Sequence, residues 1–297
     1  MEIGLWNNFK RPPWGGGNQF MLALETELCR QGHVALRNQH GQDGSIVNSI
    51  QFPLAEFEAT LPSFARVVHR VAGLFCLHRG PAGLADDERV AAFNRKYAIA
   101  TVFQSRWAAS RVLARYPLVS PRVVCNAVDP EIFHERGRRV FRPGRKIRLV
   151  ATSWSPNLRK GGPFYRDLLD RLDPVRYVFT FVGQCDALLS GAVVYPPTDS
   201  RSLADCLRNQ DIYVTASRDD ACSNALLEAL ACGLPAAYLD SGGNAEVVGE
   251  GGLPFSDVST CLAALERLAA EYARIQAAIP IRTIQDTTRA YLAAMTE

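Results

Sequence analysis

The sequence of 297 residues lacks the features that mark membrane, disulfide-rich and zinc proteins. No apolar run is long enough to cross a bilayer, and the longest stretches are short and interrupted, as in Leu226–Leu234. The eight cysteines are scattered without a CxxC pair, and the five histidines show neither HxH nor HExxH spacing. The N-terminus has no basic region followed by an apolar core. These absences favour a cytoplasmic protein with free thiols and give no indication of a zinc site.

The chain also lacks a large excess of positive or negative charge. Thirty-three basic residues against 30 acidic ones give a formal net charge of +3, which is too small to indicate nucleic-acid binding. Hydrophobic residues make up 47% of the chain and charged residues 21%, so the chain can bury a sizeable core. The length predicts one large domain or two of ordinary size.

Short apolar strands alternate with amphipathic helical stretches along the whole chain, which indicates an α/β fold with parallel sheets and crossover helices. In the first half we expect strands at Glu2–Trp6, Ala65–His69, Ile99–Gln104 and Arg122–Asn126, and helices at Asn18–Gln31, Leu84–Tyr97 and Ser105–Tyr116. In the second half we expect strands at Ile147–Ser153, Tyr177–Gly183, Val193–Pro196, Asp211–Ser217 and Pro235–Asp240. Helices are expected there at Phe164–Leu172, Ser202–Arg208, Asn224–Cys232, Ser259–Ile275 and Ile281–Met295.

A break between the two series falls near residues 135–146. Seven of the thirteen residues from Arg136 to Arg148 are basic, and glycine and proline interrupt them, as in a linker. The pattern therefore predicts two Rossmann-like domains that face each other across a cleft, at residues 1–140 and 141–278, followed by a C-terminal helix at 279–297. The basic run itself is either a solvated connector or a positive surface at the cleft that attracts an anionic substrate.

The segment Ser217–Gly233 (SRDDACSNALLEALACG) carries the strongest chemical signal. A strand ends at Ser217 and a helix begins near Ser223, and the N-terminus of a helix offers backbone N–H groups and a positive dipole end to a diphosphate. Asp220 lies before this helix and Glu228 within it, where carboxylates can accept hydrogen bonds from sugar hydroxyls. The alternative is that Asp220 caps a loop and that Glu228 is a surface residue of the helix.

Three further loops follow strands. Thr152–Gly162 (TSWSPNLRKGG) places Arg159 and Lys160 where they can neutralise phosphate charge, unless they form an ordinary solvated turn. Trp14–Gly17 (WGGG) lets backbone amides approach a ligand, although a glycine loop alone is a weak signal. His69 ends the strand FARVVH, where it either contacts a ligand or fills a structural role.

Together these motifs resemble family 4 of the glycosyltransferases, a retaining family with the two-domain GT-B fold (glycosyl transferases group 1). The resemblance covers nearly the whole chain, and its most specific part is LLEALACGLP followed by a glycine-rich loop and Glu246. It also includes QSRW at Gln104–Trp107, NAVDPEIF at Asn126–Phe133 and SGGNAEVV at Ser241–Val248. The resemblance implies an N-terminal acceptor domain, a C-terminal nucleotide-sugar donor domain, and a final helix that packs back on the N-terminal domain.

The resemblance also implies roles for individual residues. Glu228 would bind the donor ribose, Asp220 stands in place of a family glutamate at the donor sugar, and Lys160 would bind the diphosphate. The family arginine five residues before the lysine is replaced by Ser155, and Arg159 is the candidate substitute. His69, Lys160 and Asp220 are the catalytic candidates. The donor-binding candidates are Gly16, Gly17, Arg159, Lys160, Gly183, Tyr195, Asp220, Ser223, Asn224, Ala225, Glu228, Gly242 and Gly243.

The function expected from the resemblance is transfer of a sugar from a nucleotide sugar to a hydroxyl-bearing acceptor, with retention of configuration and without a metal. The donor is then a co-substrate rather than a cofactor. A degenerate GT-B protein that binds a nucleotide sugar or a partner without turnover is the main alternative, and an epimerase or phosphorylase of the same fold is another. The metal-dependent GT-A class is disfavoured because no DxD motif follows a strand. Nucleic acid is not an expected partner, whereas peripheral membrane contact and the oligomeric state stay open.

Overall fold

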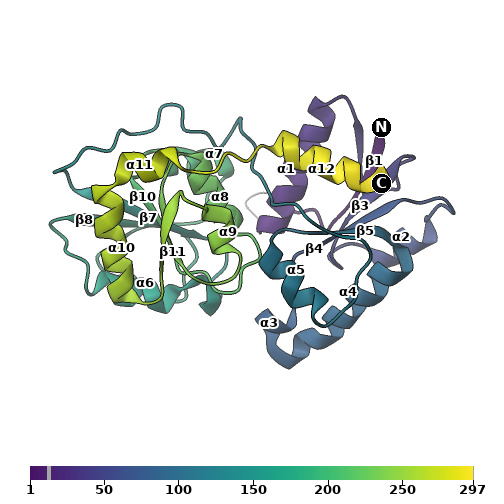
Figure 1. Cartoon of the computed structure of the whole chain (residues 1–297), viewed down its shortest axis with the longest axis horizontal. Helices are drawn as coiled ribbons and strands as arrows, with labels where there is room; N and C mark the ends of the chain where they lie inside the picture. The colour runs from purple at the N-terminus through teal and green to yellow at the C-terminus, as the bar shows by residue number, and fades with distance from the viewer. Residues whose placement is uncertain (12–14, 297) are drawn as a thin grey trace. The chain divides into compact units, whose positions relative to one another are not determined.

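The computed structural model describes residues 1–11 and 15–296, which divide into two compact units (Figure 1). The N-terminal unit contains residues 1–11, 16–127 and 282–296, and the C-terminal unit contains Gly15 and Val128–Ile281. The chain therefore returns to the N-terminal unit with its last helix. No described helix is both long enough and apolar enough to span a membrane.

The N-terminal unit is built on a parallel sheet of six strands in the order β2-β1-β3-β4-β5-β6. Its strands are β1 (Glu2–Trp6), β2 (Val34–Arg37), β3 (Gly44–Asn48), β4 (Val67–Val71), β5 (Ala98–Phe103) and β6 (Pro121–Val123). Its helices are α1 (Gly16–Arg30), α2 (Leu54–Ala59), α3 (Cys76–Arg79), α4 (Leu84–Tyr97), α5 (Arg106–Leu113) and α12 (Ile284–Thr296), with the 3-10 turn η1 (Gly80–Gly83).

The C-terminal unit repeats the plan with a second parallel sheet of six strands, in the order β12-β11-β10-β7-β8-β9. Its strands are β7 (Ile147–Ser153), β8 (Tyr177–Gly183), β9 (Val193–Tyr195), β10 (Ile212–Thr215), β11 (Ala236–Leu239) and β12 (Gly252–Phe255). Its helices are α6 (Gly162–Leu169), α7 (Ser200–Arg208), α8 (Asn224–Ala231), α9 (Asn244–Val248), α10 (Val258–Ala270) and α11 (Tyr272–Ala277), with the 3-10 turn η2 (Leu158–Lys160).

The α/β class and the parallel sheets are confirmed, and several expected elements agree with the structure to the residue, among them β1, β7, β8 and α4. The prediction missed β2, β3 and β12. These strands are four or five residues long, and each carries glycine, proline or arginine among few apolar residues. The helix expected at Ser259–Ile275 is wrong as a single element, because α10 ends at Ala270 and α11 begins at Tyr272.

Each sheet is buried by helices that follow its strands. In the C-terminal unit the core joins Leu149 and Phe179 on the strands to Leu168 of α6 and Leu265 of α10. In parallel sheets of this kind the carboxyl ends of all strands lie at one edge, and ligands bind beyond that edge. The loops after β7, β10 and β11 are therefore brought together by the fold itself.

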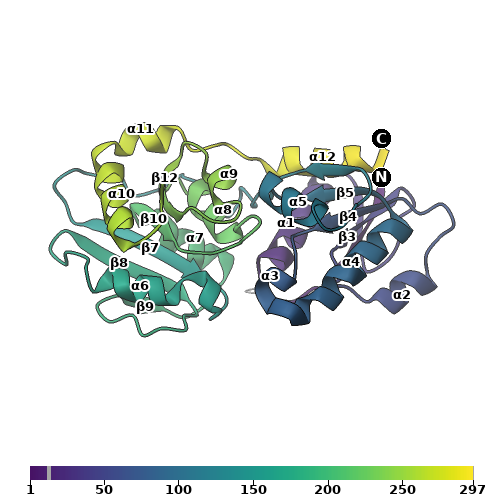
Figure 2. The ribbon, with the colours of Figure 1, turned by 60° about the horizontal axis from the view of Figure 1, so that its bottom comes forward.

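The core of the N-terminal unit is completed by α12, which lies beside α1 (Figures 1 and 2). Ile284, Tyr291 and Met295 of this helix are buried with Ile3 of β1 and Phe20 of α1. The helices that directly precede α12 along the chain, α10 and α11, belong instead to the core of the C-terminal unit.

We predict that Ile284→Ala destabilises the protein, because the Ile284 side chain is 1% exposed and its removal leaves a cavity in the N-terminal core. The expected loss in the free energy of unfolding is about 2–5 kcal/mol. Ile281→Ala is the matched control, since Ile281 is 93% exposed. Urea denaturation followed by circular dichroism measures both variants. Equal midpoints for the two variants would mean that α12 contributes little to the core.

Candidate functional site

The candidate site lies at the carboxyl ends of three neighbouring strands in the C-terminal unit. Arg159 and Lys160 are in η2, in the loop after β7. Asp219 and Asp220 follow β10 and precede α8, and the glycine pair Gly242–Gly243 follows β11. The sheet order β11-β10-β7 makes these three loops neighbours, so residues far apart in the sequence meet here.

Two ion pairs connect the loop after β7 to the loop after β10. The ammonium Nζ of Lys160 lies 2.7 Å from Oδ2 of Asp220, and Arg159 pairs with Asp219. Between these pairs the backbone N–H of Arg218 donates to the carbonyl of Arg159 at 2.9 Å. The two basic residues therefore do not form an isolated solvated turn, because each is held against an acidic residue of the neighbouring loop.

Two glycines allow these loops to approach one another. Gly161 has φ +91°, and a Cβ at this position would lie 2.5 Å from Cβ of Ala216. Gly242 has φ +65°, and a Cβ there would lie 2.4 Å from the carbonyl oxygen of Asp220. Beside it, the N–H of Gly243 donates to the same carbonyl at 2.8 Å. A side chain at either glycine would force the loops apart.

Helix α8 begins at Asn224, four residues after Asp220. Ser223 is its N-cap residue, but the Ser223 side chain makes no capping hydrogen bond. Ser223 and Asn224 are buried and Ala225 is partly buried, so the first turn of the helix belongs to the loop cluster. The N-terminus of a helix carries a partial positive charge, which adds to the charges of Arg159 and Lys160 nearby.

Glu228 lies in the second turn of α8, and it is partly buried. Burial raises the pKa of this carboxyl to about 8. Within the described part of the chain, Glu228 makes no side-chain hydrogen bond or ion pair that would offset the cost of burying its charge. The buried hydroxyl of Tyr213 on β10 has its pKa raised by burial and, to a lesser degree, by the charge of Glu228. A partly buried carboxyl without a partner is well suited to accept hydrogen bonds from a bound ligand.

The remaining candidates of the C-terminal unit lie on β8 and β9. Gly183 ends β8 with φ +121°, and a Cβ there would lie 1.9 Å from the carbonyl oxygen of Ser153, so glycine permits the close approach of β7. Tyr195 ends the edge strand β9, and its side chain is 51% exposed. The structure does not bring Tyr195 into contact with the Lys160–Asp220 pair.

Three candidates belong to the N-terminal unit. Gly16 and Gly17 open α1, while Trp14 of the same glycine loop lies outside the described residues. His69 is completely buried in β4. Its Nε2 lies 3.0 Å from the carbonyl of Ser49 and its Nδ1 lies 3.1 Å from the side-chain amide of Asn94. A carbonyl only accepts, so Nε2 carries the proton and Nδ1 accepts from the amide.

Burial lowers the pKa of His69 to about 4, so the ring is neutral at physiological pH. Both ring nitrogens are used inside the domain, as expected for the structural alternative named above. A catalytic role for His69 stays a prediction.

Polar residues that were not predicted from the sequence also hold the loops in place. The buried Asn244 donates from its side-chain amide to the carbonyls of Ser217, at 3.1 Å, and Leu239, at 3.0 Å. It therefore joins the ends of β10 and β11. The hydroxyl of Ser241 accepts a hydrogen bond from the N–H of Asp219 at 3.0 Å. Both residues belong to the segment Ser241–Asn244 (SGGN), and their position shortly after a strand was the available indication in the sequence.

A second polar cluster was also missed, at the carboxyl ends of β1, β3 and β4 in the N-terminal unit. Arg70 is only 3% exposed, and it donates to the side-chain oxygens of Asn48, at 2.7 Å, and Asn126, at 3.2 Å. Asn48 in turn donates to Asn7 at 2.8 Å. In the sequence, the available indication of this cluster was the presence of polar residues at the ends of apolar strands. Among the described residues, no group of three or more histidine, cysteine or acidic side chains is placed to hold a metal ion.

We predict that Glu228 makes stability depend on pH. The carboxyl ionises near its usual pKa of 4.5 in the unfolded chain but near 8 in the folded one, so its contribution to stability is fully present below pH 4.5. That contribution is lost as the pH rises toward about 8. Glu228→Gln stays neutral, so the melting temperature of the wild type should fall relative to this variant between pH 5 and pH 8. A difference between the two proteins that does not change with pH would contradict the raised pKa.

Comparison with known proteins connects this site to a family. Residues 165–271, which include α8 and Glu228, match the family model described as Glycosyl transferases group 1. A comparison with curated proteins finds no sequence that matches this chain.

Three solved structures illustrate the likeness in fold. HepE from Anabaena, in complex with UDP-glucose, has a TM-score of 0.72 at 13% identity and is matched over 99% of this chain and 100% of its own. AviGT4, a glycosyltransferase involved in avilamycin A biosynthesis, has a TM-score of 0.67 at 14% identity over 99% and 96% of the two chains. WaaG, a glycosyltransferase involved in lipopolysaccharide biosynthesis, has a TM-score of 0.63 at 14% identity over 98% and 95%. The chain thus has the GT-B glycosyltransferase fold, and its residues 165–271 carry a glycosyl transferases group 1 domain.

Proposed function

We propose that this protein transfers a sugar from a nucleoside diphosphate sugar to a hydroxyl-bearing acceptor, with retention of configuration and without a metal ion. The observation that carries the proposal is the meeting of Arg159, Lys160 and Asp220 beside the N-terminus of α8, with the unpaired Glu228 one turn further along the helix. The group 1 domain over residues 165–271 supports the same reaction class.

The cations and the start of α8 form the diphosphate site of this proposal. A diphosphate brings at least two negative charges, and Arg159 and Lys160 supply two positive charges next to a helix N-terminus. The Lys160–Asp220 pair is partly open to solvent, with side chains 38% and 19% exposed. Pairs of this kind contribute only about 0–1 kcal/mol, so a phosphate can replace the carboxylate as partner of Lys160.

The two carboxylates have separate roles in the proposal. Glu228 accepts hydrogen bonds from the ribose hydroxyls, which offsets the burial of its charge. Asp220 contacts the hydroxyls of the transferred sugar from the loop before α8. Asp220 is shorter by one methylene than the glutamate that the family resemblance leads one to expect, and its ion pair with Lys160 holds it close to the phosphate site.

In the transfer step, the bond between the anomeric carbon and the diphosphate oxygen breaks, and the acceptor oxygen bonds to that carbon on the same face. The acceptor proton passes to the departing diphosphate oxygen. Negative charge grows on that oxygen during the step, and Lys160 and Arg159 stabilise it. Retention is checked by the anomeric coupling constant of the product in proton NMR, and an inverted product would exclude this step.

We predict that one class of nucleotide sugar raises the melting temperature of the protein in buffer containing EDTA. UDP-glucose is tested first, because HepE was solved with it, and GDP-, ADP- and dTDP-sugars complete the panel. A ligand at one hundred times its Kd stabilises the native state by about 2.7 kcal/mol. Stabilisation that appears only after Mn²⁺ is added would exclude the metal-free site. No stabilisation by any donor would count against nucleotide-sugar binding altogether.

We predict that Lys160→Ala lowers kcat by more than it raises KM, because the Lys160 contact strengthens as charge develops on the leaving group. The expected loss in kcat is on the order of a hundredfold. Lys160→Arg should restore activity only in part, since a planar guanidinium does not replace a compact ammonium.

The matched control is Lys96→Ala, which removes a lysine from an exposed ion pair with Glu58 in the N-terminal unit and should leave kcat unchanged. An equal kcat for wild type and Lys160→Ala would refute the role of Lys160. Donor binding without turnover in the wild type, over a range of acceptors, would support a binding protein of this fold instead.

A further inference from the structure

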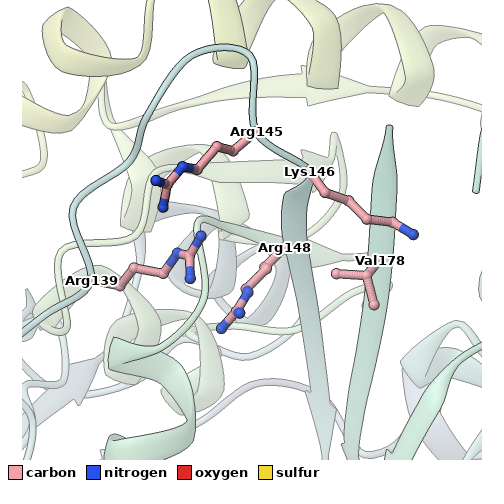
Figure 3. A pocket seen from close by; sticks show the side chains of 5 residues that line it. All are labelled: Arg139, Arg145, Lys146, Arg148 and Val178. Atoms are coloured by element: carbon pink, nitrogen blue, oxygen red, sulfur yellow. The ribbon is translucent and has the colours of Figure 1, made fainter. Parts of the chain in front are cut away.

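The basic run of residues 136–148 forms part of a cavity in the C-terminal unit. This cavity has a volume of about 430 Å³ and is lined by Arg139, Arg145, Lys146, Arg148 and Val178. Figure 3 shows the guanidinium groups of Arg139, Arg145 and Arg148 gathered on one side, while Lys146 extends past Val178 on the other. Four of the five lining residues are basic and none is acidic.

The cavity is distinct from the candidate donor site. Arg145 and Lys146 come directly before β7, Arg148 is its second residue, and Val178 is the second residue of β8. The cavity therefore lies at the amino ends of these strands, whereas Lys160 follows the carboxyl end of β7. Seven residues of β7 separate the two ends, which corresponds to roughly 20 Å at about 3.3 Å per residue.

Asp211 is the acidic residue in contact with this cluster, and it is only 2% exposed. Its carboxylate accepts a hydrogen bond from the backbone N–H of Arg148 at 2.8 Å and lies 3.7 Å from Nε of Arg139. That Nε is buried and has no hydrogen-bond partner among the described residues. The Arg148 guanidinium reaches the carbonyl of Asn209 at 3.3 Å. The buried carboxylate of Asp211 thus lies beside the guanidinium of Arg139 and holds the backbone of Arg148, while the guanidinium of Arg148 is directed to Asn209.

Arg145 and Lys146 are exposed, and within the described part of the chain neither forms an ion pair. Cations held close together repel one another, and a bound anion relieves that repulsion. Guanidinium groups bind phosphate through two parallel hydrogen bonds, which favours phosphate among the common anions. The volume is in the range of small-molecule sites, about 300–1,000 Å³, and leaves room for more than one phosphate group.

We propose that this cavity is a second anion site, which binds a ligand with a diphosphate or an esterified phosphate group. Arg139, Arg145 and Arg148 hold the phosphate oxygens, and Val178 contacts the apolar part of an ester. The ligand is either a soluble phosphate compound or the headgroup of an anionic lipid, and both present the same chemistry to the arginines.

The test is titration of inorganic pyrophosphate by calorimetry at low ionic strength. It uses full-length protein that carries Lys160→Ala, which weakens the other phosphate site. Arg145→Glu is added in one protein and Arg142→Glu in another. Both arginines are exposed residues of the same segment, but only Arg145 lines the cavity, so the change in net charge is matched. We expect Arg145→Glu to weaken binding at least about tenfold and Arg142→Glu to change it less than about twofold.

A second arm measures sedimentation of the same proteins with vesicles of phosphatidylglycerol or of phosphatidylcholine. If the protein sediments with phosphatidylglycerol vesicles but not with phosphatidylcholine vesicles, and only Arg145→Glu abolishes this binding, the result supports the site. It also identifies the headgroup of an anionic lipid as the ligand. Pyrophosphate binding with the same sensitivity, but no vesicle binding, supports it with a soluble ligand. Equal losses in both variants, or no binding of either probe, would overturn the proposal. Neither arm uses turnover, so the result is independent of the proposed transferase activity.

Discussion

The contact between Lys160 and Asp220 joins two loops that are 60 residues apart in the chain, and the candidate donor site depends on it. The parallel sheet places the loops side by side, Gly161 and Gly242 let their backbones approach, and the ion pair fixes the side chains that face the ligand. Because the pair is partly exposed, it costs little to break. The site is thus organised before a donor binds, and Lys160 remains available to a phosphate.

The C-terminal unit carries two groups of cations at opposite ends of the same strands. At the carboxyl ends, Arg159 and Lys160 each have an acidic partner. At the amino ends, three arginines and Lys146 line the cavity, and the buried carboxylate of Asp211 pairs with Arg139. The first arrangement suits the proposed donor, which must enter and leave during turnover, because the carboxylates can pair with the cations again after the ligand departs. The second leaves more positive charge uncompensated and therefore favours a ligand that stays bound.

Much of the fold could be predicted from the sequence because β7 (IRLVATS) and β8 (YVFTFVG) are seven-residue segments rich in β-branched and other apolar residues, a composition typical of buried parallel strands. Short strands such as β12, with Pro254 in four residues, carry too little pattern and form only because a neighbouring strand offers hydrogen bonds. The same limit applies to the site. The position of Glu228 on a helix followed from spacing, but the raised pKa of its carboxyl depends on the packing around it.

The ion pairs of the site could not be derived from the sequence either, because Asp219 and Asp220 are adjacent and local sequence does not say which of them meets Lys160. Likewise, the sequence placed His69 at a strand end but left its two possible roles open. The hydrogen bonds to Ser49 and Asn94 come from residues 20 and 25 positions away, and only the folded chain brings them to the ring. Local sequence patterns do not reveal contacts between residues that lie this far apart in the chain.

The return of α12 to the N-terminal unit has a consequence for synthesis on the ribosome. Translation at about 5–20 residues per second would produce the stretch Val128–Ile281 in roughly 8–30 s. Throughout that interval the nascent N-terminal sheet lacks Ile284, Tyr291 and Met295, and the apolar side chains that they cover remain uncovered. The N-terminal sheet is therefore synthesised before the C-terminal unit, but its core is completed after it. Until α12 emerges, the nascent polypeptide exposes apolar side chains that chaperones can recognise.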